Sequence, residues 1–359
     1  AVRDRFEETG RFEAFDFGWK EGQPKKPHFF WDSDVAKWIE SAAYLIHKKP
    51  DPELEAKIED LIDKIEEHQE PDGYFNIYFT VADPASRFKN RQWHELYCAG
   101  HLIEAAVAYY EATGRDRFLN SMKKYADLIY ETFFIRKENP VYRTPGHEEI
   151  ELALVKLWKV TGEQKYLDLS AYFIDTRGTP EDVWECPWGY TKFSGQAHLP
   201  VREQKTAEGH SVRAGYLYSA MADNARARGD EALFDACKTL FKNITERRMY
   251  ITGGVGSTHH SEAFTVDWDL SNKGAYAETC AAIALAFFSD RMLNLEADSR
   301  YADTVERVLY NGFLAGLSLD GEKFFYTNPL KITLWDRGRN PSMPKDPDYK
   351  PIPERVRVF

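Results

Sequence analysis

Apolar residues recur every three to four positions along most of the chain, which is the period of an α-helix with one buried face. The first such segment has Val35, Trp38, Ile39, Ala42, Ala43 and Ile46 at its apolar positions. The segments predicted to be helices are Asp34–Lys48, Glu53–Glu67, Glu95–Glu111, Phe118–Phe133, Glu148–Val160, Lys165–Asp175, Ser211–Arg228, Glu231–Arg247, Glu278–Asn294 and Tyr301–Gly316.

The predicted helices come in pairs with short connections. Thr113-Gly114, Thr161-Gly162 and Gly229 stand where the first helix of a pair should end, because glycine favours the conformation that closes many helices. The pairs form an internal repeat of helical hairpins, and an all-α protein is expected. The hairpins would stack as an open solenoid or close into an (α/α)6 barrel, whose last hairpin would lie beyond Phe359.

A few segments do not follow the helical period. Tyr74–Thr80 and Lys323–Thr327 are candidates for short strands. Arg177–Leu199 and Ile251–Leu270 are long connections, and loops this long in a compact domain are usually functional or disordered. Their aromatic content favours ordered segments that help to form a site.

The first helix of each later hairpin begins beside a histidine or a glutamate, namely His94, His147, His210 and Glu278. In a closed barrel of hairpins these helices run parallel, so their N-termini gather at one mouth. Helix N-termini carry unpaired N–H groups and a partial positive charge, which suit polar ligands. The four side chains are therefore expected to converge in one pocket, although a single histidine at a helix start is more often a cap or a structural residue.

Two further groups could carry chemistry. Glu278 and Cys280 can reach one metal ion from the start of a helix, and zinc accepts oxygen, nitrogen and sulfur ligands, usually four in all. A buried structural cysteine is the ordinary alternative. Glu262 lies in a loop among glycine, aromatic and apolar residues, which could raise its pKa and let it protonate a leaving oxygen. A solvated loop glutamate is the simpler interpretation.

Composition narrows the choice of partners. Aromatic residues make up 14% of the chain, which suits a sugar-binding cleft and equally a large core with tyrosines at its rim. The net charge of -11 argues against nucleic-acid or membrane partners, and no apolar run approaches the roughly 20 residues of a membrane span. The cysteines, Cys98, Cys186, Cys237 and Cys280, form no CxxC pair, so we expect a reducing, cytoplasmic compartment. Whether the protein forms a homo-oligomer is left open.

Several stretches resemble glycoside hydrolase family 127, the β-L-arabinofuranosidases. They run through most of the chain in order: His94-Glu95-Leu96-Tyr97-Cys98-Ala99-Gly100-His101-Leu102, Thr144-Pro145-Gly146-His147, Gly209-His210-Ser211-Val212-Arg213, Thr252-Gly253-Gly254-Val255-Gly256, Ser261-Glu262-Ala263-Phe264 and Ala277-Glu278-Thr279-Cys280.

The resemblance implies an (α/α)6-barrel catalytic domain over residues 1–359, followed in the intact protein by β-sandwich domains. It implies a retaining hydrolase that releases terminal β-L-arabinofuranose from small arabinosides or oligosaccharides, with a zinc-bound cysteine thiolate as nucleophile. Glu262 matches the acid/base of the family, and Glu278 and Cys280 match two zinc ligands. The residues that resemble those lining the sugar subsite are His94, His147, His210 and Tyr326.

The chain departs from the family in one important respect. The other two zinc ligands of the family are adjacent cysteines, one of them the nucleophile, and no such pair occurs in this sequence. We therefore expect the nucleophile beyond Phe359, and interpret the chain as a segment that is incomplete at both ends. A relative that has lost its nucleophile is the alternative.

Two other functions compete with this hypothesis. One is a different (α/α)-barrel enzyme, such as a sugar epimerase or an unsaturated-uronyl hydrolase, which would need no zinc. The other is a non-catalytic helical-repeat protein that binds carbohydrate. Stoichiometric zinc bound through Cys280 would favour the hydrolase, and a loss of turnover in a Glu262 variant would exclude the non-catalytic protein.

Overall fold

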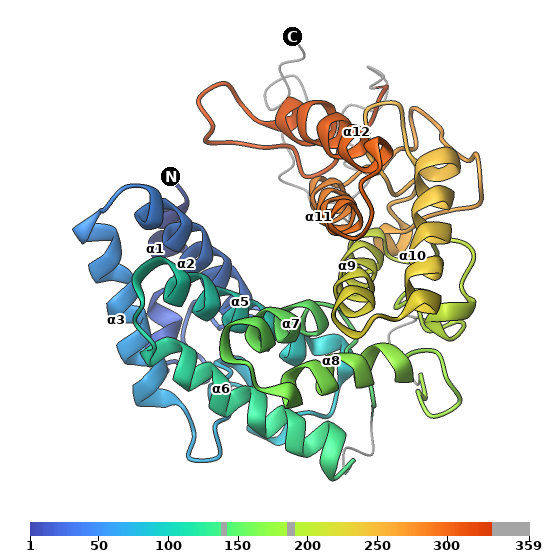
Figure 1. Cartoon of the computed structure of the whole chain (residues 1–359). Coiled ribbons are helices and arrows are strands. Elements are labelled where there is room, and N and C mark those ends of the chain that lie inside the picture. Colours follow the sequence, from blue (N-terminus) through green and yellow to red (C-terminus); the bar gives the residue numbers. More distant parts are fainter. Residues whose placement is uncertain (138–141, 185–190, 332–359) are drawn as a thin grey trace. The chain divides into compact units, whose positions relative to one another are not determined.

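A computed structural model describes residues 1–137, 142–184 and 191–331 of the protein. Cys186 and the Pro-rich stretch after residue 331 lie outside these ranges. Helices dominate the described part of the chain (Figure 1), and the all-α prediction is confirmed. No helix in that part is long and apolar enough to cross a membrane.

The predicted helices are confirmed with ends that differ by a few residues. The longer helices are α1 (Val2–Thr9), α2 (Trp31–Lys48), α3 (Pro52–His68), α5 (Glu95–Thr113), α6 (Arg117–Ile129), α7 (Ile150–Thr161), α8 (Gln164–Thr176), α9 (Ser211–Arg228), α10 (Glu231–Asn243), α11 (Thr279–Leu295) and α12 (Ser299–Arg307). The glycine stops behave as expected: Gly114 ends α5 with φ 73° and donates its N–H to the carbonyl of Tyr110.

Three helices continue into π-helical turns that the pattern does not predict. Tyr130–Ile135, Ile244–Arg248 and Val308–Phe313 follow α6, α10 and α12 without a break. Each of these helices is the second of its hairpin. Because the wider π-helical turn inserts a residue per turn, it shifts the buried face of the helix at this point.

The two predicted strands are wrong. Tyr78–Val81 forms the short helix α4, and the residues before it, from Tyr74, are buried but irregular. Lys323–Thr327 makes only isolated bridges, Leu317 with Phe324 and Glu278 with Thr327. Within the described residues the neighbours of this segment are a turn and a helix entry, so no second strand extends either bridge into a sheet.

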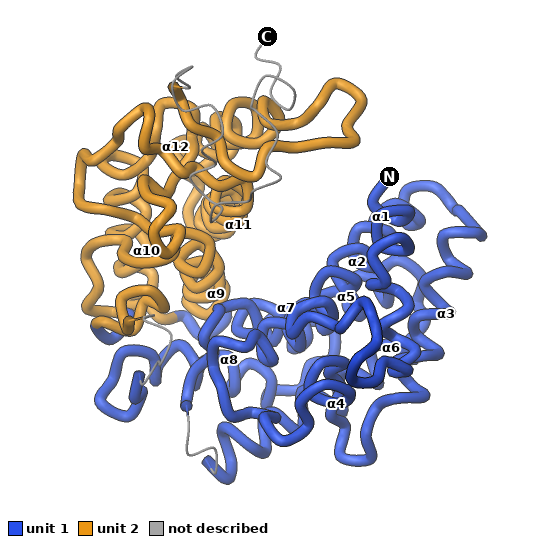
Figure 2. Tube along the Cα trace, turned by 180° about the vertical axis from the view of Figure 1, so that it is seen from behind, with its two compact units in different colours: residues 1–189, 199–201, 227–229 blue, residues 190–198, 202–226, 230–359 orange. Residues whose placement is uncertain are grey.

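The chain forms two compact units, each with its own packing (Figure 2). Unit 1 comprises residues 1–189, 199–201 and 227–229, and unit 2 comprises residues 190–198, 202–226 and 230–359. In unit 1, α2, α5 and α7 pack side by side in one layer, and α3, α6 and α8 lie against them. Helix α5 is the centre of this packing, and Ala99, Leu102, Ile103 and Ala106 along it are fully buried.

Unit 2 repeats the hairpin arrangement with its own apolar contacts. Tyr218 of α9 packs on Phe288 of α11, with ring centroids 5.5 Å apart. Phe241 of α10 packs on the same Phe288 at 6.0 Å and on Tyr301 of α12 at 4.7 Å. These buried aromatic side chains hold the four helices together.

Candidate active site

The predicted site residues fall into two groups, one in each unit. His94 and His147 lie in unit 1, whereas His210, Glu262, Glu278, Cys280 and Tyr326 lie in unit 2. Each of the four residues expected at a helix start is found there: His94 and Glu278 precede the first residues of α5 and α11, His210 precedes α9, and His147 lies just ahead of α7.

His94 and His147 are neighbours. Their ring centroids lie 5.6 Å apart, and both rings contact Tyr97, which lies 5.3 Å from His94 and 4.4 Å from His147. Tyr97 stands one turn into α5, and its hydroxyl accepts a hydrogen bond of 2.8 Å from the Lys37 ammonium of α2. The two histidines and the tyrosine form one aromatic and polar surface.

Backbone carbonyls determine which ring nitrogens of these histidines carry a proton. The Nδ1 atom of His94 lies 2.6 Å from the carbonyl oxygen of Gln92, and that of His147 lies 2.9 Å from the carbonyl oxygen of Glu148. A carbonyl oxygen can only accept, so each Nδ1 donates. In the neutral rings each Nε2 is then an acceptor, which suits the hydroxyl of a sugar.

A fully buried arginine holds the loop that carries His147. Arg177 lies 2.9 Å from Glu148 and 3.1 Å from Glu151, and it donates to the carbonyl of Pro145 at 3.0 Å. All three side chains are completely inaccessible to solvent. Water cannot reach these charges, so the arginine and the two glutamates compensate one another. The contacts of Arg177 connect the loop ahead of α7 to the end of α8.

Glu262 is the centre of the group in unit 2. The Nε2 atom of His210 lies 2.6 Å from its Oε2, and the Tyr276 hydroxyl donates to its Oε1 at 2.8 Å. The Nδ1 atom of His210 accepts from the backbone N–H of Arg213 at 3.4 Å, so Nε2 carries the proton and donates to Glu262. The Ser211 hydroxyl donates to the main-chain carbonyl of Glu262 at 2.9 Å.

The backbone is strained at several of these positions. His94 has φ 63°, Glu262 has φ 52°, and Ala277, directly before Glu278, has φ 41°. Residues other than glycine rarely adopt these angles, and such strain is concentrated at functional sites. Gly209, beside His210, also has a positive φ of 74°, and a Cβ there would lie 1.9 Å from the carbonyl oxygen of Phe193. Only glycine fits at that position.

The expectation of a raised pKa for Glu262 is wrong for this structure. Burial by itself would raise the pKa, but the hydrogen bond and charge of His210, together with the hydrogen bond from Tyr276, lower it below the usual value. Both donors stabilise the carboxylate form. Sequence patterns could not reveal this, because neither donor is adjacent to Glu262 in the chain.

Glu278 and Cys280 lie together at the entry of α11. The buried Glu278 side chain hydrogen-bonds with Cys280 and with Tyr326. Burial and then the charge of Glu262 raise the pKa of Glu278 to about 7. The ring of Tyr326 also packs on Tyr276, 6.5 Å away, and so connects Glu278 to the Glu262 group.

These residues fit the zinc ion that the family resemblance implies. Glu278 is only 2% exposed, and its Oε2 has no hydrogen-bond partner among the described residues. A buried carboxylate oxygen without a partner, next to a thiol, is a donor set that zinc accepts. No disulfide joins the three cysteines of the described ranges, Cys98, Cys237 and Cys280.

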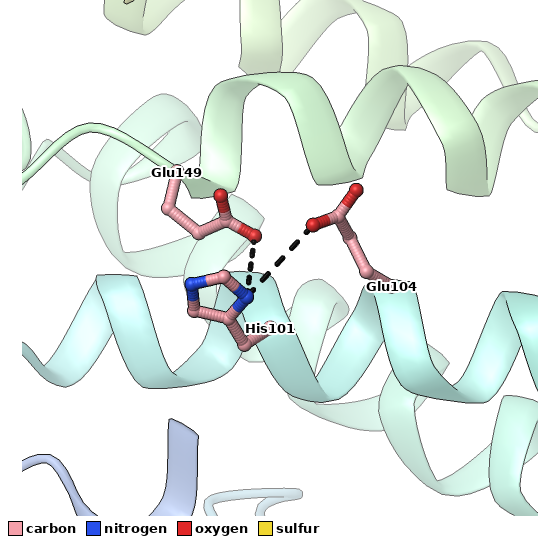
Figure 3. Close-up of side chains that lie close together, drawn as sticks. All are labelled: His101, Glu104 and Glu149. Carbon is pink, nitrogen blue, oxygen red and sulfur yellow. Dashed lines mark ion pairs between the residues drawn. The ribbon is translucent and has the colours of Figure 1, made fainter. Parts of the chain in front are cut away.

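A second group of possible metal ligands lies in unit 1. The ligand atoms of His101, Glu104 and Glu149 all lie within 4.8 Å of one another, and the three side chains are buried (Figure 3). No sequence pattern predicts this group as a site. The signal for it was His101 and Glu104, one turn apart on α5, but Glu149 comes from a different helix.

Two more side chains of the site were also missed. Tyr97 lies within the His94 motif, three residues after the histidine, which places it on the same face of α5. Tyr276 lies two residues before Glu278 and hydrogen-bonds to Glu262. An aromatic residue beside a motif is a weak signal, because many tyrosines of the described ranges lie in the core.

Comparison with known proteins finds β-L-arabinofuranosidases. A sequence model described as "Beta-L-arabinofuranosidase, GH127 catalytic domain" matches residues 3–346. A non-reducing end β-L-arabinofuranosidase of Bifidobacterium longum subsp. longum is 44% identical over 322 residues, which are 85% of this chain and 49% of that protein.

Solved structures are similar as well. A GH127 β-L-arabinofuranosidase from Geobacillus stearothermophilus T6 has a TM-score of 0.88 and 50% identity, covering 95% of this chain and 56% of that one. A GH127 β-arabinofuranosidase has a TM-score of 0.83 and 40% identity, covering 92% of this chain and 52% of that one.

Fold and site define a helical-hairpin protein of the (α/α)-barrel type. The chain belongs to glycoside hydrolase family 127. It spans about half the length of the curated relative that it matches.

Proposed function

We propose that the protein containing this chain is a retaining glycoside hydrolase that releases terminal β-L-arabinofuranose from arabinosides. The observation that carries the proposal is Glu262, held at 2.6 Å by His210 and at 2.8 Å by Tyr276, and connected through Tyr276 and Tyr326 to Glu278. Family membership favours this hydrolase over an epimerase, a uronyl hydrolase or a binding protein.

Glu262 serves as the acid/base in this proposal. Retaining glycosidases need one carboxyl group that protonates the leaving oxygen and then takes a proton from water. The two donors on Glu262 favour its carboxylate form. Glu262 therefore takes up a proton before it protonates the leaving oxygen, and the carboxylate that this leaves accepts the proton of water in the second half of the reaction. His210 and Tyr276 each hydrogen-bond to one carboxylate oxygen of Glu262. They therefore fix the position at which Glu262 gives and accepts a proton.

The histidines and Tyr326 would bind the sugar. The Nε2 atoms of His94 and His147 would accept hydrogen bonds from sugar hydroxyl groups. The ring of Tyr97 is the apolar part of the same surface. In unit 2, His210 contacts Glu262 directly, and Tyr326 packs on Tyr276, the second partner of Glu262. Sugar hydroxyls hydrogen-bond to such side chains, and their C–H faces pack on aromatic rings.

Glu278 and Cys280 would hold zinc. When bound, zinc keeps thiol groups deprotonated at neutral pH, and this is the chemistry it would supply. Glu278 contributes a carboxylate that is already buried and whose Oε2 is unpaired among the described residues. The adjacent cysteines that the resemblance implies as the other two ligands and nucleophile are not in this sequence, and we expect them elsewhere in the protein.

The test is Glu262→Gln in the full-length protein. With an alkyl β-L-arabinofuranoside, whose leaving group needs protonation, we expect kcat to fall by about 10²–10⁴-fold. With a nitrophenyl arabinoside, whose leaving group departs without an acid, the first step should be much less affected. The matched control is Glu246→Gln, a change at an exposed glutamate of the same unit. Turnover of the alkyl substrate within tenfold of the unchanged protein would remove Glu262 from the mechanism.

A further inference from the structure

The buried triad His101, Glu104 and Glu149 lies directly behind the surface formed by His94, Tyr97 and His147. The Nδ1 atom of His101 lies 3.2 Å from Glu149 and 3.9 Å from Glu104 (Figure 3). On its other side the His101 ring packs edge-on against Tyr97, with centroids 4.5 Å apart. Tyr97 in turn contacts both of the histidines proposed to bind sugar.

Two lysines and a third glutamate lie close to the triad. Lys156 of α7 forms an ion pair with Glu104 and lies 3.7 Å from Glu40 of α2. Lys37 of α2 lies close enough to interact electrostatically with both His101 and Glu149. The titratable and charged groups that face Glu149 or its partners are Lys37, Glu40, Tyr44, Tyr97, His101, Glu104 and Lys156. Asp34 also acts on Lys37, and its own charge is compensated by an ion pair of 2.8 Å with Arg11.

Charge balance distinguishes a proton from a metal ion in this cluster. Glu40, Glu104 and Glu149 face the two ammonium groups of Lys37 and Lys156. One proton shared by the three carboxyl groups leaves two negative charges against two positive ones, so the buried cluster is neutral. A divalent cation on the ionised carboxylates would leave a net positive charge and would stand beside Lys156. Buried net charge is costly, and the proton avoids it.

Among the three carboxyl groups, Glu149 is the one best placed to hold the proton. Glu104 forms an ion pair with Lys156, which favours its carboxylate form, and Glu40 has Lys156 and the Tyr44 hydroxyl as partners. Glu149 faces a neutral histidine and hydrogen-bonds with Glu104. Burial, followed by the charge and hydrogen bond of Glu104, raises the pKa of Glu149 well above its usual range. Burial and the two lysines lower the pKa of His101.

We propose that Glu149 is a positioning residue of the sugar site, a neutral carboxylic acid that links His101 to Glu104 and so fixes the ring of Tyr97. The Nδ1 atom of His101 lies 3.2 Å from one oxygen of Glu149, and the neutral carboxyl group of Glu149 donates its proton to Glu104. The chain from Lys156 through Glu104, Glu149 and His101 to Tyr97 then sets the position of His94 and His147. The inference rests on the proposed function, because it gives these two histidines a role in sugar binding.

The discriminating experiment compares Glu149→Gln with Glu149→Met in the full-length protein. Glutamine keeps one donor and one acceptor, as a neutral acid does, whereas methionine keeps the length of the side chain but neither polar group. We expect KM for an arabinoside to stay within about threefold in Glu149→Gln and to rise at least tenfold in Glu149→Met. The change should fall mainly on KM, because the histidines contact the sugar before and during the reaction.

A second measurement needs no variant and no activity. In protein labelled with ¹⁵N-histidine, NMR should show His101 neutral from neutral to mildly alkaline pH, because burial and the two lysines lower its pKa. A charged His101 in that range would overturn the proposal, and so would an equal loss of affinity in Glu149→Gln and Glu149→Met. It would also be overturned by a metal ion that remains bound in Cys280→Ser and disappears when His101→Gln is added.

The two proposals fail in different ways. If the unchanged protein does not hydrolyse arabinosides, the proposed function is lost, and the histidine spectrum still decides the protonation of the triad. If the protein hydrolyses arabinosides but His101 is charged, the function stands and the role of Glu149 is lost. If Glu149→Met does not fold, the spectrum of the unchanged protein remains the deciding result.

Discussion

Single side chains in this protein do more than fill the core, and Arg177 is the clearest case. It is fully buried and connects Glu148, Glu151 and the carbonyl of Pro145. Two glutamates at the start of α7 would repel each other without it. The position of His147, which directly precedes Glu148, therefore depends on an arginine at the end of α8 that sequence patterns did not single out.

Arg177→Met should destabilise the protein by about 3–5 kcal/mol, because it leaves two buried carboxylates without a counter-charge. The matched change is Arg228→Met, which removes an exposed ion pair with Asp175 and should cost at most about 1 kcal/mol. Urea unfolding of both variants measures the difference. Equal midpoints for the two would show that the buried charges find other partners.

Helix α5 and the start of α7 approach each other very closely at one point. In α5, a Cβ on Gly100 would lie 2.6 Å from the Cγ atom of Glu149 and 2.9 Å from the backbone of Ile150. The start of α7 therefore sits directly on the backbone of α5. This approach brings Glu149 to His101, so the triad behind the sugar site requires a residue without a side chain at position 100.

Gly100→Ala should be destabilising, although alanine is the better helix former. Its helix propensity would contribute about 1 kcal/mol in favour of the variant. Crowding against Glu149 and Ile150 should cost about 1–3 kcal/mol and outweigh it. The control is Gly18→Ala, where the nearest atom is 3.9 Å away. A Gly100→Ala protein with a higher urea midpoint than the parent would contradict the expected crowding.

The whole chain distributes its site residues unevenly between the two units. The proposed zinc donors, Glu278 and Cys280, and the proposed acid/base, Glu262, all belong to unit 2, whereas two of the histidines proposed to bind sugar belong to unit 1. Metal binding should therefore stabilise unit 2 first. A ligand that binds only the folded form adds about 2.7 kcal/mol when present at a hundred times its dissociation constant.

Removal of zinc by a chelator should lower the melting temperature of the full-length protein, and Cys280→Ser should abolish that shift. The control is Cys237→Ser, which changes a buried cysteine of the same unit and should leave the chelator effect in place. Differential scanning calorimetry with and without chelator measures all three proteins. A full chelator shift in Cys280→Ser would exclude this thiol as a ligand.

Local pattern was enough to predict the helical hairpins and most of their ends. The helical period and the glycine stops act over a few residues, so Ser211–Arg228 was predicted with the bounds that α9 has in the structure. The same holds for His94, His210 and Glu278 at helix starts. The two short strands were predicted wrongly, because a strand needs a partner strand and no local pattern shows whether that partner exists.

The protonation of the site could not be predicted, because it arises between segments far apart in the chain. Glu262 is a carboxylate on account of His210, 52 residues away, and of Tyr276. The proposed neutral form of Glu149 arises from burial and then from the charge of Glu104, whereas the charge of Lys156 opposes it. Local patterns determine which residues begin each helix, whereas packing determines which groups each residue meets, and a pKa depends on those groups.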